Sequence, residues 1–252
     1  MFCRVFIFFQ ISLLGFFPVQ GQQFLNKGMI EFEVKTNVQK TIGEGTWGMM
    51  LKENLPNFKT GYYEFLFSGA KSLYRFSKWA ESPKIPEFMR RDDEQHIYFM
   101  DHRAGKMYQQ KMVIGSNFYV EDSIPSIRWR LTNESRVIAG FNCRKAVGII
   151  MDSVYIFAFY TDEIMISGGP CSINGLPGMI LGLTIPRLYV SFIATKVSLI
   201  VPVEEIKPVS TKKFSKRSDL QKIVTERAKE WSSDEDENSK KWRDQFLWNA
   251  ML

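Results

Sequence analysis

Alternating apolar and polar side chains constrain the fold of this chain more than any other feature. In the stretch MIEFEVKTNV, Ile30, Phe32 and Val34 alternate with polar or charged residues, the pattern of a strand with one buried face. The same period of two returns in most segments up to Leu199, and turn signals separate those segments about every ten residues. We therefore expect an all-β fold with about eight to ten strands, either a single antiparallel, strongly curved sheet or a sandwich or half-barrel.

Turn residues place several of these strands. The sequence Ser-Gly-Ala-Lys at 68–71 predicts one hairpin, and Asp101–Gly105 predicts a second. Between them, Trp79–Asp93 contains two prolines and predicts a longer loop. Further strands are expected at Ser126–Leu131, Lys145–Met151, Ser153–Tyr160, Met179–Leu183 and Leu188–Leu199.

The first 21 residues have the composition of a signal peptide. Arg4 precedes an apolar run over residues 5–19, and the small residues before Gln22 suit cleavage there. Two polar residues interrupt the run, which makes it short for a membrane span, although a buried strand or a membrane anchor is the alternative. No cysteine directly follows the run, so a lipoprotein anchor is not expected. We expect residues 1–21 to be removed and the mature protein to reach the periplasm without a transmembrane segment.

The composition changes at residue 207. Residues 22–206 are expected to form one antiparallel β domain, whereas residues 207–252 are charged and helix-prone and predict a helical tail. Ser218 is expected to cap a first helix that runs through Ala228 to Trp231. A second short helix would place three apolar side chains on one face, which would either bind a partner or belong to a solvated, loosely docked appendage. These three are Trp242, Phe246 and Leu247.

Two cysteines remain after removal of the signal peptide, Cys143 and Cys171. In an oxidising compartment two cysteines most simply form one disulfide. It would close a loop of roughly thirty residues and stabilise the fold by about 3–4 kcal/mol. The alternatives are two free thiols or a metal site, for which only two histidines are present as further ligands.

The formal net charge is +6, and loss of Arg4 reduces it to +5. The Lys and Arg residues are spread among Asp and Glu residues, and an exported protein does not meet nucleic acid in the cell. We therefore expect no nucleic-acid partner. A mild attraction to anionic lipid or lipopolysaccharide is compatible with this charge.

No arrangement of residues in the sequence predicts catalysis. The glycine-rich segment Gly168–Gly178 lacks the lysine and the following helix that phosphate-binding loops need. No nucleophile elbow is present, and His96 and His102 are the only histidines. These two could share a strand face, with nearby aspartates completing a metal site, but the turn between them favours an ordinary hairpin. We expect a non-enzymatic protein without catalytic residues, metal ligands or a cofactor.

Two tripeptides, Asp122-Ser123-Ile124 and Asp152-Ser153-Val154, resemble the Asp-Ser/Thr-apolar sites at which periplasmic proteins of the Bacteroidetes are O-glycosylated. Because such tripeptides are frequent by chance, Ser123 and Ser153 are weak candidate sites. The intact mass of the secreted protein tests them.

The hexapeptide Gly175-Leu176-Pro177-Gly178-Met179-Ile180 resembles the one that names the GLPGLI family of exported Bacteroidetes proteins, with Met179 in place of a leucine. The segment AGFNCRKAVGIIMDSVYIFAFYTDEI resembles the family's central Gly-x-x-Cys-x-x-Ala segment and the strand after it, and GMIEFEVKTNV resembles its opening strand. The resemblance covers about residues 28–200 in the same order, and the tail lies outside it. It implies a periplasmic or outer-membrane-associated β protein, encoded beside TonB-dependent transporters, and it implies no activity, cofactor or catalytic residue.

Two functions follow as expectations. The first is an accessory or binding partner of a TonB-dependent outer-membrane β-barrel transporter, or of an envelope assembly. The alternative is a periplasmic carrier that holds a lipid or another apolar ligand in the cavity of the curved sheet. The hexapeptide would then be a rigid β corner, or a surface that a partner recognises.

Overall fold

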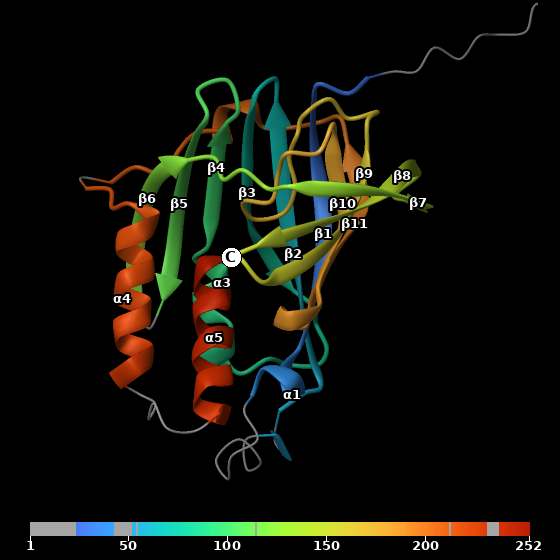
Figure 1. Ribbon diagram of the computed structural model, residues 1–252. Coiled ribbons are helices and arrows are strands. Elements are labelled where there is room, and N and C mark those ends of the chain that lie inside the picture. Colours follow the sequence, from blue (N-terminus) through green and yellow to red (C-terminus); the bar gives the residue numbers. More distant parts are fainter. Residues whose placement is uncertain (1–23, 43–51, 54, 114, 212, 231–236) are drawn as a thin grey trace, which may run out of the picture.

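The computed structural model describes residues 24–42, 52–53, 55–113, 115–211, 213–230 and 237–252. The described residues form eleven strands, all hydrogen-bonded in one sheet (Figure 1). Neighbouring strands run antiparallel, which confirms the expected fold class, while the expected signal peptide lies outside the described residues. The strands are β1 (Lys27–Asn37), β2 (Phe58–Ser68), β3 (Lys71–Trp79), β4 (Ile97–Asp101), β5 (Lys106–Val113), β6 (Ser116–Ser123), β7 (Trp129–Ile138), β8 (Phe141–Ile150), β9 (Val154–Thr161), β10 (Met179–Ile185) and β11 (Val190–Ser198).

β1 lies in the middle of the sheet, and the chain builds one arm on each side of it. The strand order is β6-β5-β4-β3-β2-β1-β11-β10-β9-β8-β7. The two edge strands, β6 and β7, are therefore consecutive in the chain, and only residues 124–128 join them. A segment of that length spans about 20 Å when fully extended, so the two edges approach each other at this end. The sheet is strongly curved, as expected (Figure 1).

Both predicted hairpins are present. β2 and β3 join at Ser68–Lys71, where Gly69 has a φ of +56°, and β4 and β5 join at Asp101–Lys106. The predicted loop between the two hairpins contains a short 3-10 helix, η1 (Glu87–Met89), and a one-turn helix, α3 (Arg91–Glu94).

The edge strands are where sequence and structure differ most. β6 was not predicted, because Phe118, Tyr119 and Val120 are adjacent apolar residues that break the alternation, and Val120 alone of the three is buried. β7 begins later than predicted, at Trp129, and extends to Ile138. An edge strand packs against the sheet on one side only, so its side chains carry a weaker pattern of burial.

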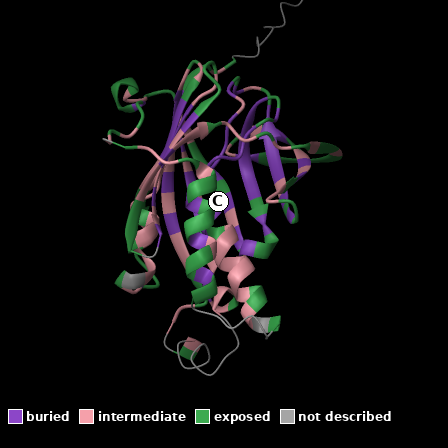
Figure 2. Ribbon diagram, turned by 60° about the vertical axis from the view of Figure 1, so that its left-hand side comes forward, coloured by how far each residue is buried: buried purple, intermediate pink, exposed green. Residues whose placement is uncertain are grey.

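The inward faces of the strands form the main core. On β1, Ile30, Phe32 and Val34 are buried while the residues between them are partly exposed, as the alternation predicts. β10 is buried at every position except Thr184. Figure 2 shows the buried residues gathered along the strands, with exposed residues in the loops and on the helices.

The tail packs into the fold as two helices, α4 (Arg217–Glu230) and α5 (Glu237–Met251). Both helices bury side chains against Val113 and Val120, near the edge formed by β5 and β6. The expected loose appendage is therefore part of a continuous packed structure. The buried side chains of the two helices are Leu220, Val224, Ala228, Ala250 and Met251.

The segment that precedes α4 covers part of the edge of β6. The backbone N–H of Ser215 donates to the carbonyl of Tyr119 at 2.8 Å, and its carbonyl accepts from the N–H of Glu121 at 3.0 Å. The first N–H of α4, at Arg217, donates to Asp122 Oδ2 at 3.0 Å, so an aspartate of β6 replaces the predicted serine cap. At the opposite edge, β7 pairs with β8 and with no other described strand.

Three further short elements connect the strands: α1 (Val38–Thr41), η2 (Pro186–Leu188) and η3 (Val203–Glu205). Across the part of the chain that the structure describes, none of the helices is both long and apolar enough to cross a membrane.

Candidate ligand-binding site

A cavity of about 700 Å³ lies where the tail helices meet the sheet. Its walls come from the β6–β7 connection, the β8–β9 turn, the loop before β10, α4 and the last turns of α5. The lining is mixed. Its polar side chains are Ser126, Arg128, Asp152, Ser172, Arg217 and Gln221. Its apolar side chains include Ile127, Ile150, Met151, Ile173, Leu247 and Trp248.

Two basic side chains hold the last turn of α5 against this cavity. Lys111 of β5 donates from Nζ to the carbonyl of Ala250 at 2.7 Å, and the guanidinium of Arg217 donates to the carbonyl of Met251. A helix leaves its last carbonyls without partners inside the helix, and its dipole favours positive charge at that end. The two cations therefore fix the wall that α5 contributes.

Lys111 is almost completely buried, with 2% of its surface exposed. Burial lowers the pKa of Lys111 to about 7; the nearby Arg217 lowers it further, while Cys171 and Asp93 act in the opposite direction. The Lys111 Nζ lies 5.7 Å from the centre of the Tyr98 ring, close enough for the ring to attract the cation. At neutral pH Lys111 is therefore only partly protonated, and it holds α5 chiefly as a hydrogen-bond donor.

A column of tyrosine rings lies beside Lys111. The ring centres of Tyr63 and Tyr74 are 5.3 Å apart, and those of Tyr74 and Tyr98 are 6.0 Å apart. Burial raises the pKa of all three well above the usual tyrosine value, so these residues stay neutral. Within the described residues the hydroxyl of Tyr74 has no hydrogen-bond partner. The column supplies packing and no titrating group.

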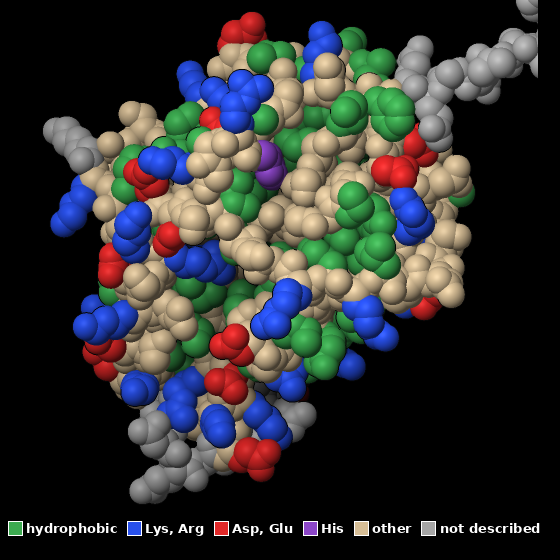
Figure 3. All heavy atoms as spheres, turned by 45° about the horizontal axis from the view of Figure 1, so that its top comes forward, with side chains coloured by type: hydrophobic (Ala, Val, Ile, Leu, Met, Phe, Trp, Pro, Cys, Tyr) green, Lys and Arg blue, Asp and Glu red, His purple; other side chains and the backbone are tan. Residues whose placement is uncertain are grey.

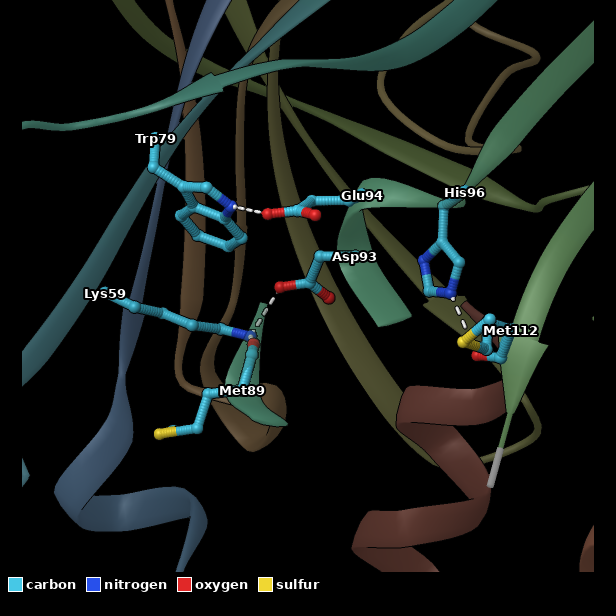
Figure 4. A network of polar contacts seen from close by, with 7 residues as sticks. All are labelled: Lys59, Trp79, Met89, Asp93, Glu94, His96 and Met112. Carbon is cyan, nitrogen blue, oxygen red and sulfur yellow. Dashed lines mark hydrogen bonds and ion pairs between the residues drawn. The ribbon is translucent and has the colours of Figure 1, made fainter. Parts of the chain in front are cut away.

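A second polar cluster fastens the loop between the two hairpins to the sheet (Figure 4). Lys59 Nζ of β2 lies 2.5 Å from Asp93 Oδ2, and Trp79 Nε1 of β3 donates to Glu94 Oε1 at 2.6 Å. Asp93 and Glu94 both belong to α3, so one helical turn is tied to two strands. Each of these groups is paired with its neighbour, which indicates a structural role for the cluster.

The two histidines have separate surroundings. His96 Nε2 is 3.2 Å from the carbonyl of Met112 (Figure 4), and burial lowers the pKa of His96 to about 4. Burial also lowers the pKa of His102, whose Nε2 has no partner in the described residues. No group of three or more His, Cys, Asp or Glu residues in the described ranges is placed to hold a metal ion.

The expected disulfide between Cys143 and Cys171 is not formed, and both residues are buried free thiols. Cys143 of β8 has its Sγ 3.5 Å from the carbonyl of Phe141, whereas Cys171 shares a side-chain hydrogen bond with Tyr98. Burial raises the pKa of Cys143 to about 11 and that of Cys171 to about 12. The prediction was wrong because cysteine count and compartment say nothing about the distance between two side chains.

The hexapeptide Gly175–Ile180 forms a rigid corner that leads into β10, which begins at Met179 as predicted. Gly178 has a φ of +137°, and a Cβ at this position would lie 2.0 Å from the carbonyl oxygen of Thr161. The backbone of the corner therefore lies directly against β9, where only glycine fits. Leu176, Met179 and Ile180 are buried, and Gly175 and Pro177 are exposed.

Two of the three residues of the expected tail stripe pack against the rest of the protein. The rings of Trp242 and Phe246 stack with centres 5.4 Å apart and planes 3° apart. Phe246 and Leu247 pack against the cluster that joins the tail to the sheet, and Leu247 also lines the cavity. Of the three stripe residues, Leu247 therefore contributes to the cavity wall, while Trp242 and Phe246 lie outside the lining.

Ser123 and Ser153, the candidate O-glycosylation sites, are both exposed. Ser123 ends β6, and its N–H donates to Asp122 Oδ1 at 2.8 Å. Ser153 lies in the β8–β9 turn beside Asp152, which lines the cavity. Both positions are reachable, and their modification stays a prediction.

Sequence reasoning missed the basic residues of the cavity. Lys111 did leave a signal, because Met107, Gln109, Lys111 and Val113 take the alternate, buried positions of β5. A lysine on the buried face of a strand is rare and needs a partner. Arg217 left no such signal, because it meets the cavity only through the packing of the tail.

Solved structures resemble this chain at low sequence identity. Two crystal structures of PNGF-II, from different space groups, each match with a TM-score of 0.48, at 15% and 14% identity. They cover 76% and 89% of this chain but 31% and 33% of their own, so the chain spans about a third of their length. The structure of an uncharacterized conserved protein from Thermus thermophilus matches with a TM-score of 0.36 at 8% identity, covering 74% of this chain and 88% of its own. The search of curated proteins returned no match.

A family model described as N-glycanase peptide, N-terminal domain, matches residues 89–223. The match crosses the predicted boundary at residue 207 and ends inside α4, in agreement with a tail that packs on the sheet. Because the match covers more than half of the chain, this protein belongs to the N-glycanase peptide, N-terminal domain family.

Proposed function

We propose that this chain is a non-enzymatic binding protein that holds an amphiphilic, lipid-like ligand in the cavity between the tail helices and the sheet. The observation that carries this proposal is the cavity itself. Its volume of about 700 Å³ lies within the range of about 300–1,000 Å³ that small-molecule sites occupy. The curved sheet and the pinned end of α5 supply rigid walls.

The chemistry of the lining favours an amphiphile. Ten of the sixteen lining residues are apolar, four of them isoleucines, and the other six are polar or charged. A ligand with one apolar and one polar part matches both sets, because each buried polar group then meets a polar partner.

A carbohydrate is the rival ligand, since the family description names an N-glycanase. Sugar rings commonly stack on aromatic side chains, and Trp248 is the single aromatic residue of the described lining. The guanidinium of Arg187 already lies over that ring, 5.1 Å from its centre. The one aromatic ring of the described lining is therefore already partly covered, which is why an amphiphile is proposed ahead of a sugar.

The proposed setting is the periplasm, from the signal-like residues 1–21 and the hexapeptide that resembles the GLPGLI family. Membership of that family is proposed alongside the N-glycanase domain match. A periplasmic binding protein of this kind would carry its ligand between the two membranes.

Native mass spectrometry of the protein, purified from its own envelope, tests the proposal. We expect a bound lipid-like molecule that organic extraction removes. Gln221→Trp, on the exposed side of α4 that faces the cavity, is expected to fill the space and lower ligand occupancy. Lys222→Trp, next in sequence and outside the lining, is the control and is expected to retain the ligand. A ligand-free protein that binds no added amphiphile would contradict the proposal.

A second candidate function is an accessory role for a TonB-dependent outer-membrane transporter, and it is favoured by the surface beside the hexapeptide. A hollow of about 250 Å³ is lined there by Pro177, Phe24 and Met165, and the last two are 55% and 65% exposed. Exposed apolar side chains grouped in this way often mark a protein contact. In a pull-down from the envelope, Met165→Glu is expected to lose a barrel partner that Ile200→Glu, at another exposed position outside this hollow, retains.

A further inference from the structure

The charged residues of the cavity are mostly basic. Arg128 and Arg217 line it, Asp152 is the one acid of the described lining, and Lys111 lies behind the last turn of α5. On the molecular face shown in Figure 3, by contrast, basic and acidic side chains are mixed. We propose that the cavity binds a single-chain amphiphile with an anionic headgroup, and that Arg217 and Arg128 bind that headgroup. This inference rests on the proposed function and names the chemistry of its ligand.

Burial lowers the pKa of Arg217 and Asp122 acts in the opposite direction, but neither Arg128 nor Arg217 forms an ion pair with a described residue. No carboxylate of a described residue forms an ion pair with the side chain of Arg128, Arg217 or Lys111. Burial makes the positive charge of Arg217 costly unless an opposite charge approaches it, whereas Arg128 is exposed. An anionic ligand would supply that charge, which is why its headgroup is expected at this end of the cavity.

Arg217 is oriented by the protein and still has donors available. Its backbone N–H is held by Asp122 Oδ2 at 3.0 Å, and its guanidinium donates to the carbonyl of Met251. A guanidinium carries five N–H donors, and no other acceptor for it occurs among the described residues. The remaining donors match the paired oxygens of a carboxylate or a phosphate.

Arg128 and Ser172 complete the polar end of the cavity. Arg128 is exposed just before β7 and forms no hydrogen bond or ion pair with a described residue. Ser172 is 3% exposed and lines the cavity, and none of the described residues hydrogen-bonds its hydroxyl. Both can therefore turn to a headgroup without breaking an existing contact. The apolar chain of the ligand would contact Ile127, Ile173 and Trp248.

The test is a binding assay on the full mature chain after organic extraction. The probe is 1-anilinonaphthalene-8-sulfonate, and the competitors share one chain length: myristate, myristoyl lysophosphatidylglycerol, monomyristin and tetradecyltrimethylammonium. We expect the two anionic competitors to displace the probe about tenfold better than neutral monomyristin, and the cationic one to be the weakest. Myristate and the lysophospholipid distinguish a carboxylate from a phosphate headgroup.

Arg128→Gln is the diagnostic variant, because this side chain forms no hydrogen bond or ion pair with a described residue. It is expected to reduce the anionic preference about fivefold. Arg130→Gln, an exposed arginine of β7 outside the lining, is expected to leave it unchanged. Equal competition by monomyristin and myristate, or an equal loss in both variants, would overturn the anionic headgroup while leaving an amphiphile carrier standing. Binding of a free N-linked oligosaccharide in place of every amphiphile would overturn both proposals.

Discussion

Replacing Lys111 with methionine is expected to stabilise the protein at neutral pH, although it removes a hydrogen bond. Burial lowers the pKa of Lys111 from its usual 10.5 to about 7. The unfolded chain therefore binds this proton more tightly than the folded chain, which costs the fold about 5 kcal/mol at pH 7. Methionine has a similar length and no charge, but it leaves the carbonyl of Ala250 without its donor, at about 1–3 kcal/mol. The net gain is about 2–4 kcal/mol at pH 7.

The free energy of unfolding of the wild-type protein is expected to rise with pH above about pH 7. Between pH 7 and 10.5 the unfolded lysine is protonated and the folded one is not, so wild-type stability rises with pH by about 1.4 kcal/mol per unit. The variant lacks this contribution, so its advantage is expected to shrink by about 3 kcal/mol between about pH 7 and pH 9. Cys171, Arg217 and Asp93 also surround this site, and comparison of the two proteins at each pH removes their shared contribution.

Urea unfolding at about pH 7, 8 and 9, followed by tryptophan fluorescence, measures these differences. Lys106→Met is the control, because Lys106 lies on the same strand with an exposed side chain paired to Glu121. It is expected to leave the pH slope over this range as in the wild type. A Lys111→Met protein that is less stable at neutral pH, with the wild-type pH slope, would refute the reasoning and show that the buried cation stabilises the fold.

Four other predictions test the glycines, the buried histidine and the cysteines. Gly178→Ala, whose Cβ would lie 2.0 Å from a carbonyl oxygen of β9, is expected to lose about 4 kcal/mol or more. Gly69→Ala, with a φ of +56° and open space around it, is expected to lose about 1 kcal/mol by the same urea assay. Burial lowers the pKa of His96 to about 4. The free energy of unfolding is therefore expected to fall by about 3 kcal/mol as the pH falls from about 6.5 to 4. His96→Gln is expected to flatten that fall, and an unchanged fall in this variant would assign it to other groups. Finally, alkylation without reductant is expected to label Cys143 and Cys171 only after unfolding, and failure to label unfolded protein would indicate a disulfide.

The local pattern of residues correctly predicted which strand side chains are buried. The period of two on β1 identified its buried side chains, and the turn residues at Ser68–Lys71 and Asp101–Gly105 identified two hairpins. These features depend on neighbours in sequence, where side-chain direction and backbone preference are both visible. The start of β10 at Met179 followed from the same reasoning.

Contacts between segments far apart in the sequence could not be predicted from the local pattern of residues. The pairing of β1 with β11 and the return of the tail to β6 join residues far apart in the chain. The cavity depends on both, because its walls come together only after the sheet curves and α5 docks. The cysteine count likewise predicted a disulfide, although whether one forms depends on the distance between the two thiols. Lys111 was the one site residue that alternation alone could have identified.

The two edges of the sheet differ in how far they are covered, and this difference bears on self-association. Exposed edges invite the addition of another strand, and unlimited addition at two edges builds a fibre. Here Ser215 and α4 occupy part of the β6 edge, while β7 carries backbone groups that no described strand pairs. Another strand is therefore expected to add at β7, and two copies that join through β7 would form a closed pair. The part of the β6 edge that Ser215 occupies cannot pair with a further copy.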